Sequence, residues 1–179
     1  EVLVVENGST DSTLDVARSA AAEHEQLRVL REVRRGKGLA VRTGMLEARG
    51  QYRFLCDADL SMPIEQVGRF LPPELTGVDV AIGSREAPGA VVYDEPAHRK
   101  MIGRWFNRLT RLVLLPGLRD TQCGFKCFRA EAAKFIFARQ VIEGMAFDPE
   151  VLYIARRKGY TLAEVPIDWY FDPDSRVRL

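Results

Sequence analysis

Short apolar runs alternate with helix-patterned segments over the first sixty residues of the chain. The runs cover Glu1 to Val5, Leu27 to Leu30 and Tyr52 to Cys56; each reads as a strand, and the first is typical of a strand buried on both faces. Between them, apolar side chains recur at roughly helical spacing from Leu14 to Ala21 and from Leu39 to Leu46. This alternation predicts an α/β fold with a mixed, mostly parallel sheet flanked by helices. Because 46% of the 179 residues are hydrophobic, we expect one core and a single domain over residues 1–179.

The remaining elements follow from the same patterns and from the breaker residues. We expect helices at Pro63 to Leu71, Lys100 to Leu115, Ala130 to Ala138 and Pro149 to Lys158, strands at Val78 to Ile82, Gln122 to Phe128 and Thr161 to Trp169, and an irregular loop from Ala87 to Pro96. The helix from Lys100 is amphipathic and carries a row of arginines on its polar side. No apolar stretch approaches the roughly 20 residues that span a bilayer.

Two aspartates one residue apart, Asp57 and Asp59, follow the apolar run Phe54 to Cys56 directly. On extended backbone, residues i and i+2 point the same way, so both carboxylates can approach one divalent cation. Mg²⁺ and Mn²⁺ prefer a few carboxylates together with phosphate oxygens and water. The pair therefore predicts a metal site at the carboxyl edge of the sheet. The alternative is that it only caps the helix that begins near Pro63.

Basic residues recur at the ends of other predicted elements. Lys37 stands between two glycines at a helix start, where backbone N–H groups and the helix dipole favour an anion. Arg85 follows a buried strand and Arg99 follows the long loop, and a guanidinium can hold a phosphate with two hydrogen bonds. A solvated turn is the alternative for Lys37. The formal net charge of +1 argues against a nucleic-acid partner, and Cys56, Cys123 and Cys127 lack the spacing of a zinc site.

Five segments, taken in order, resemble a known family. They read VENGSTDST from Val5 to Thr13, GKG from Gly36 to Gly38, DADLS from Asp57 to Ser61, IGSR from Ile82 to Arg85, and DTQCGFK from Asp120 to Lys126. The set is similar to family 2 glycosyltransferases of the GT-A (Rossmann-like) fold, in particular the dolichyl- and polyprenyl-phosphate β-glucosyltransferases and the dolichyl-phosphate mannose synthase-like enzymes. The resemblance implies inverting transfer of a hexose from a nucleoside diphosphate sugar, with UDP-glucose favoured, to a polyprenyl or dolichyl phosphate with Mg²⁺ or Mn²⁺.

The resemblance also implies a role for each matching residue. Donor binding falls to Glu6, Asn7, Lys37 and Asp57, with Asn7 standing where the family usually has Asp. The metal ligands are Asp57, Asp59 and Ser61. Acceptor and phosphate binding falls to Arg85, Arg99, Gln122 and Lys126, while Asp57, Asp59, Arg85 and Asp120 are the catalytic candidates. Asp120 is the nearest match to the acidic pair that supplies a base in relatives with hydroxyl acceptors. Asp148 also matches a family motif, although an N-cap of the following helix explains it as well.

One departure from the family concerns the start of the chain. The family begins with an earlier strand that helps to hold the nucleotide, so we expect the domain to be N-terminally incomplete. The basic helix over residues 99–111 and the lipid acceptor favour a cytoplasmic protein that can associate with the cytoplasmic face of a membrane.

Three other interpretations stay open at this point. The acceptor could be a sugar hydroxyl, or the fold could serve as a non-catalytic module that binds nucleotide sugars. The sequence around Asp57 and Asp59 also fits a haloacid-dehalogenase-like phosphatase, although the later acidic pair of that family has no counterpart here.

Overall fold

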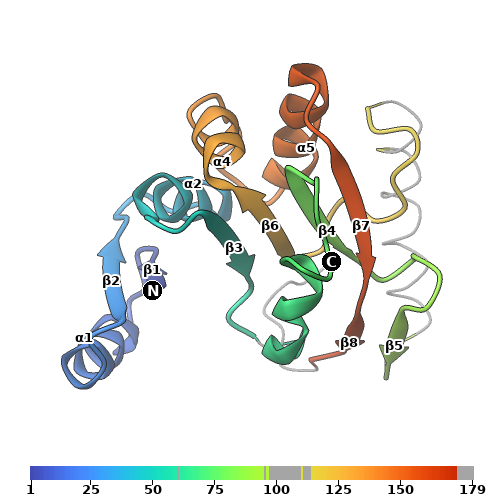
Figure 1. The fold of residues 1–179 in the computed structure, drawn as a ribbon. Helices are drawn as coiled ribbons and strands as arrows, with labels where there is room; N and C mark the ends of the chain where they lie inside the picture. The colour runs from blue at the N-terminus through green and yellow to red at the C-terminus, as the bar shows by residue number, and fades with distance from the viewer. Residues whose placement is uncertain (60, 95, 97–109, 111–113, 173–179) are drawn as a thin grey trace.

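The structure is a computed structural model that describes residues 1–59, 61–94, 96, 110 and 114–172. Its strands are β1 (Val2–Glu6), β2 (Leu27–Arg31), β3 (Tyr52–Cys56), β4 (Val80–Ser84), β5 (Val91–Tyr93), β6 (Phe125–Arg129), β7 (Leu162–Pro166) and β8 (Asp168–Tyr170). Its helices are α1 (Thr13–Glu23), α2 (Lys37–Glu47), α4 (Ala130–Phe137), α5 (Phe147–Lys158) and the 3₁₀ helix η1 (Ile64–Phe70). The alternation of strands and helices in Figure 1 confirms the expected α/β class.

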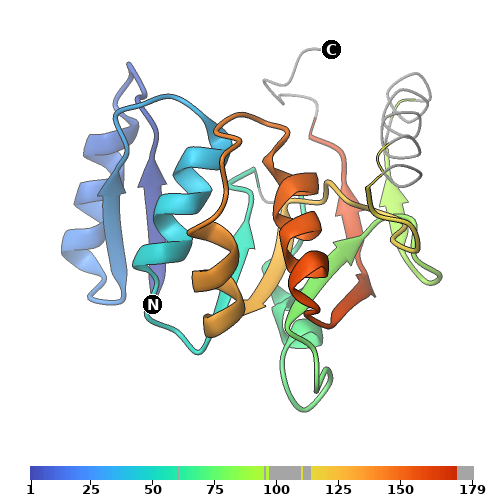
Figure 2. The same cartoon turned by 90° about the horizontal axis from the view of Figure 1, so that it is seen from above.

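The strands are hydrogen-bonded in three groups. β1 pairs with β2 in parallel, the central group has the order β3-β6-β4-β7, and β5 pairs with β8. In the central group β6 runs antiparallel to β3 and β4, whereas β7 runs parallel to β4. The carboxyl ends of β3, β4 and β7 therefore lie at one edge, and Figure 2 shows β1 and β2 pointing the same way. The polar segments that follow β1, β3 and β4 gather there.

Apolar side chains cover both faces of the central strands. On one face, α2, α4 and α5 pack over β3, β4 and β6 (Figure 1), with Ile82, Phe128 and Phe137 in the centre of the cluster. On the other face, η1 contributes Phe70, whose ring meets that of Phe125 edge-on with the centroids 5.2 Å apart. Burial on both faces fits the largely apolar sequences of β3, β4 and β6, in which the charged Arg53 and Lys126 are themselves buried.

Three elements differ from the expectation. The segment from Pro63 forms 3₁₀ helix, and the loop from Ala87 to Pro96 contains the short strand β5. The expected strand from Thr161 to Trp169 is divided into β7 and β8. The division comes at Pro166, which has no N–H to donate to a ladder, and the next residue, Ile167, donates to the Ser84 carbonyl and accepts from Val91 N. The chain thereby passes from pairing with β4 to pairing with β5.

The helix expected at Lys100 to Leu115 lies largely outside the described residues. Within the part of the chain that is described, no helix combines the length and the apolar character needed to cross a membrane.

Candidate active site

Asp57 lies at the carboxyl end of β3, pressed against a glycine. Its N–H donates to the Gly124 carbonyl at 3.1 Å, and a Cβ at position 124 would overlap its carboxylate, because it would lie 2.8 Å from Oδ1 and closer still to Oδ2. The ammonium of Lys37, at the start of α2, lies 2.8 Å from the same carboxylate. The carboxylate is about one quarter exposed, so it is held in place and remains open to solvent.

Asp59 and Ser61 lie in the turn that follows. Asp59 is exposed, and its Oδ1 accepts a hydrogen bond from Ser61 N at 3.0 Å. Ser61 is buried, and its carbonyl accepts from Tyr170 N at 2.8 Å. The metal role that the sequence assigns to the Ser61 hydroxyl stays a prediction. These bonds fix the backbone of the turn and leave the second Asp59 oxygen for other partners.

The donor set at this turn fits Mg²⁺ or Mn²⁺ only as a shared site. Among the described residues, His, Cys, Asp and Glu side chains nowhere form a group of three or more that could hold a metal ion. Asp57 and Asp59 thus offer two hard carboxylate ligands, both reachable from solvent. Such a pair suits an ion that takes its remaining ligands from substrate phosphates and water.

Asn7 connects the turn after β1 to the segment before α2. Its amide donates to the Glu32 and Arg34 carbonyls at 3.2 and 2.6 Å, and its Oδ1 accepts from Gly36 N at 2.8 Å. Glu6 is buried and accepts from Ser9 N. The two residues hold these loops together, and their direct contact with a donor stays a prediction.

The start of α2 also packs tightly against residues 140–143. Leu39 N donates to the Glu143 carbonyl at 3.1 Å, and Gln140 Nε2 donates to the Gly38 carbonyl at 2.8 Å. A Cβ at Gly36 or at Gly38 would collide with the carbonyl oxygen of Glu143 or Ile142. The two glycines beside Lys37 are therefore needed for this contact, a role that their sequence pattern did not reveal.

Arg85 and Asp120 form a two-pronged ion pair. Arg85 Nε lies 2.7 Å and Nη2 3.1 Å from the Asp120 oxygens, and the N–H groups of Arg85 and Gln122 also donate to this carboxylate. Burial opposes ionisation of Asp120, but the Arg85 charge and the hydrogen bonds outweigh it and hold its pKa below the usual range. The lowered pKa makes the Asp120 carboxylate a weak base, and the catalytic role expected for Asp120 stays a prediction. Arg85 remains about one third exposed.

Lys126 does not lie at an open surface. It is fully buried, and its ammonium lies 2.5 Å from Asp148 Oδ1 and donates to the Cys123 carbonyl. Both Lys126 and Asp148 are enclosed, so the structure does not place the Lys126 ammonium at an open surface, and the acceptor-phosphate contact expected for it stays a prediction. Asp148 is not a helix cap either, since α5 begins one residue earlier at Phe147.

Two other expected site residues complete the account. Gln122 is half-buried between Asp120 and the turn at Cys123, and its phosphate contact stays a prediction. Arg99 lies outside the described residues. The structure thus brings Lys37 and Asp57 together and pairs Arg85 with Asp120.

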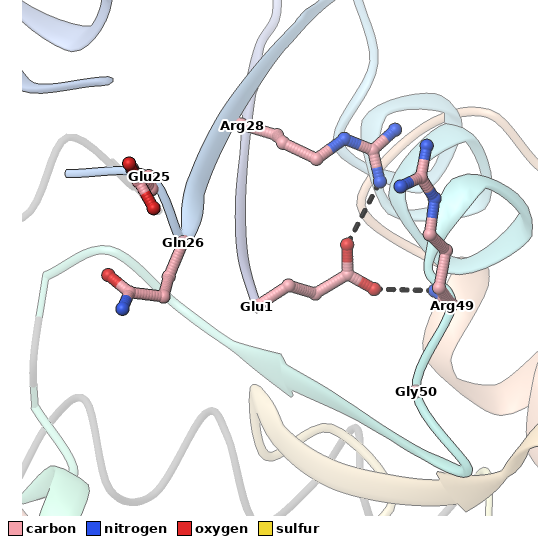
Figure 3. Close-up of a pocket in the computed structure, with 6 residues that line it drawn as sticks. All are labelled: Glu1, Glu25, Gln26, Arg28, Arg49 and Gly50. Carbon is pink, nitrogen blue, oxygen red and sulfur yellow. Dashed lines mark hydrogen bonds and ion pairs between the residues drawn. The ribbon is translucent and has the colours of Figure 1, made fainter. Parts of the chain in front are cut away.

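A shallow hollow at the opposite end of the strands is not part of this site. Figure 3 shows it between the starts of β1 and β2 and the turn before β3, lined by Glu1, Glu25, Gln26, Arg28, Arg49 and Gly50. Glu1 accepts from Arg28 Nη1 at 2.9 Å and from Arg49 N at 2.5 Å. Its carboxylate is thus used to join the end of α2 to the β1–β2 pair.

Solved structures share this fold. Glucosyl-3-phosphoglycerate synthase from Mycobacterium tuberculosis in complex with UDP matches 99% of the chain and 61% of its own length, with a TM-score of 0.67 and 20% identity. The same enzyme in complex with Mn²⁺, UDP-glucose and phosphoglyceric acid matches 93% of the chain and 58% of its own length, with a TM-score of 0.65 and 19% identity. The likeness confirms the GT-A fold expected from the sequence.

Sequence relatives and a family model identify the chain more closely. It is 35% identical over 186 residues to a dolichyl-phosphate β-glucosyltransferase of Trichomonas vaginalis, covering 100% of the chain and 55% of the relative. It is 34% identical over 179 residues to the human dolichyl-phosphate β-glucosyltransferase, covering 94% of the chain and 55% of the relative. The chain thus spans about half the length of these relatives. The model of glycosyl transferase family 2 matches residues 1–137, and the chain belongs to that family.

Proposed function

We propose that the chain carries the catalytic site of an inverting glycosyltransferase that moves glucose from UDP-glucose to dolichyl or polyprenyl phosphate with Mg²⁺ or Mn²⁺. The observation that carries the proposal is the Asp57 carboxylate, fixed at the carboxyl edge by Lys37 and Gly124 with Asp59 close by in the chain. Relatives named for dolichyl phosphate and a fold neighbour bound to UDP-glucose and Mn²⁺ support the substrates and the metal.

Asp57 and Asp59 would hold the metal together with the donor diphosphate. The bound ion would neutralise the negative charge that grows on the departing diphosphate. Arg85 is rigidly placed at the end of β4 by its bonds to Asp120, so it would meet phosphate oxygens without reorganising, as efficient electrostatic stabilisation requires. Lys37 would add a second cation, in direct contact with Asp57.

The charges of the site favour a phosphate acceptor over a sugar hydroxyl. A hydroxyl needs a carboxylate base to remove its proton, yet Asp57, Asp120 and Asp148 are each paired with a cation, and the remaining carboxylate, Asp59, is assigned to the metal. A phosphate monoester with a second pKa near 6 is largely dianionic at neutral pH and can attack without a base. The single-step attack on the anomeric carbon from the side opposite the diphosphate would invert its configuration.

Of the three other interpretations, one is excluded and two remain. The haloacid-dehalogenase interpretation does not hold, because the chain belongs to glycosyl transferase family 2. A hydroxyl acceptor and a non-catalytic module remain competitors that experiment separates.

The test uses the full-length enzyme, radiolabelled UDP-glucose, and either dolichyl phosphate or an oligosaccharide as acceptor. We expect lipid-soluble label that depends on Mn²⁺ or Mg²⁺, with β linkage to the phosphate, and a loss of at least 100-fold in rate for Asp59→Asn. Label in the oligosaccharide instead would refute the acceptor. Metal-dependent UDP binding with no transfer would favour the module.

We also propose that the protein works at the cytoplasmic face of a membrane. Four exposed apolar side chains support the membrane contact, on two loops at the edge that carries Lys37: Val33, Val141, Ile142 and Met145. The loops are neighbours, because Arg34 and Glu143 form an ion pair at 3.4 Å, and both lie at the top of Figure 2. An apolar patch beside a site for a lipid phosphate is suited to contact the bilayer that holds the lipid.

Vesicle co-sedimentation tests the membrane contact. We expect Val141→Ser with Met145→Ser to reduce binding to vesicles of phosphatidylcholine and phosphatidylserine several-fold. Val16→Ser changes another exposed valine, on α1, and should have no effect. Equal binding of all three proteins would refute the proposed surface.

A further inference from the structure

Lys126 and Asp148 form the most deeply buried ion pair among the described residues. The side chains are 0% and 5% exposed, and the ammonium nitrogen lies 2.5 Å from Oδ1. Removing two charges from water is costly, and apolar residues of similar volume often serve stability as well or better. A buried pair of this kind therefore calls for a reason other than stability.

The pair is joined to Asp57 through one short turn. Lys126 donates to the Cys123 carbonyl as well as to Asp148, so the ammonium ties the start of the turn to the first helical turn of α5. The next residue, Gly124, accepts from Asp57 N and lies directly against its carboxylate. Any shift of the turn at residues 123–124 therefore moves the surface on which that carboxylate rests.

Electrostatics connect the same groups. Burial raises the pKa of Asp148; the Lys126 charge acts against this increase, and the Lys37 and Asp57 charges also reach Asp148. Two ion pairs, Lys126–Asp148 and Lys37–Asp57, thus lie near each other. Within each pair the side chains are in direct contact, and between the pairs the charges act only over a longer range. Removing one member of the buried pair leaves an uncompensated charge beneath the site.

We propose that the Lys126–Asp148 ion pair is a positioning element of the active site. It fixes the turn at Cys123 and Gly124, and through that turn it sets the place of the Asp57 carboxylate for the metal and the donor diphosphate. Both residues act through Asp57 and touch no substrate. The proposal rests on the proposed function, since it assigns the pair to the same donor site.

The test replaces the pair by apolar residues in the full-length enzyme. Lys126→Met with Asp148→Leu removes both charges together, so no lone charge is buried, and we expect the melting temperature to stay within a few degrees of wild type. We expect the Mn²⁺-dependent affinity for UDP, measured by calorimetry, to fall at least ten-fold. We also expect a larger fold-change in kcat than in the KM for the lipid phosphate. If this variant does not fold, Lys126→Met with Asp148→Asn is measured in its place.

Two further variants separate positioning from general damage. Glu131→Leu with Lys134→Met removes an exposed ion pair of α4 with a 3.1 Å contact and should leave the UDP affinity unchanged. Asp148→Asn removes the counter-charge of the Lys126 ammonium but retains an oxygen that can accept its hydrogen bond, so the UDP affinity should fall less than in the apolar variant. Alkylation of Cys123 in the folded protein reports the turn directly, and its rate should increase in the apolar variant.

The outcomes distinguish the two proposals. An unchanged UDP affinity in a folded apolar variant would overturn the positioning role, whatever the acceptor is. A wild-type enzyme that binds UDP with Mn²⁺ but transfers no glucose to dolichyl phosphate would overturn the proposed function, and the binding and alkylation results would still decide on the pair. A wild-type enzyme that binds no UDP with Mn²⁺ would overturn both.

Discussion

Replacing Gly124 by alanine tests the placement of Asp57 most directly. The added Cβ would lie 2.8 Å from Asp57 Oδ1 and closer to Oδ2, whereas real Cβ atoms essentially never come within 3.0 Å of a neighbour. The carboxylate must therefore retreat by on the order of 1 Å, a displacement that can cost roughly 100-fold in rate. That factor corresponds to about 2.7 kcal/mol of transition-state stabilisation.

The same substitution should do little to the fold. The Lys37–Asp57 pair is about one quarter exposed at each end, so losing it costs at most about 1 kcal/mol after screening by solvent. Gly124 does not adopt a positive φ, so alanine is not strained by the backbone itself. We therefore expect kcat/KM to fall while the melting temperature changes by only a few degrees.

The assay compares Gly124→Ala with Gly68→Ala in the full-length enzyme. Gly68 lies in η1, and a Cβ there meets no atom within 4 Å, so this control changes the same residue type without touching the site. Glucose transfer to dolichyl phosphate and thermal unfolding are measured for both. If Gly124→Ala keeps kcat/KM within about three-fold of wild type, the carboxylate is not held where we place it, and the reasoning fails.

Three further outcomes follow from the described contacts. Asn7→Ala removes three hydrogen bonds between loops and should lower the free energy of unfolding in urea by ~2 kcal/mol; no change would show that solvent replaces them. Because the folded pKa of Asp120 lies below the ordinary value of 3.8, its carboxylate adds stability above that pH, and this part is lost as the pH falls through the folded pKa. Urea midpoints between pH 2 and 6 should accordingly fall less steeply with acid in Asp120→Asn than in wild type. Burial raises the pKa of the Cys123 thiol to about 12, so iodoacetamide at pH 8 should modify half-buried Cys56 first, as mass spectrometry of the peptides would show; equal rates would contradict the burial.

The fold and the edge that carries the site were readable from local patterns. Tyr52 to Cys56 is a strand with the bounds expected, because a short apolar run between a glycine and two aspartates leaves little choice. The placement of Lys37 and Asp57 at one sheet edge follows from the same reasoning. The antiparallel direction of β6 was not readable, since the direction of a strand depends on long-range pairing and not on its own side chains.

The charge pairing inside the site was not readable either. Lys126 and Arg85 both resemble phosphate ligands in the sequence, yet Lys126 is enclosed with Asp148 and Arg85 is joined to Asp120. One signal was present, because Lys126 stands between Phe125 and Cys127 in a strand with apolar neighbours on both sides. A lysine at such a position needs a buried partner, but only the fold reveals which carboxylate supplies it.

The close packing of Gly36 and Gly38 against residues 140–143 has a consequence for recombining this chain with its relatives. The two segments are about a hundred residues apart in sequence and meet with no room for a methyl group between them. A chimera that carries only one of the two segments would pack it against a sequence that did not evolve with it. Chimeras should exchange both segments together. A mismatch between them would displace the start of α2 and move Lys37 away from the Asp57 carboxylate.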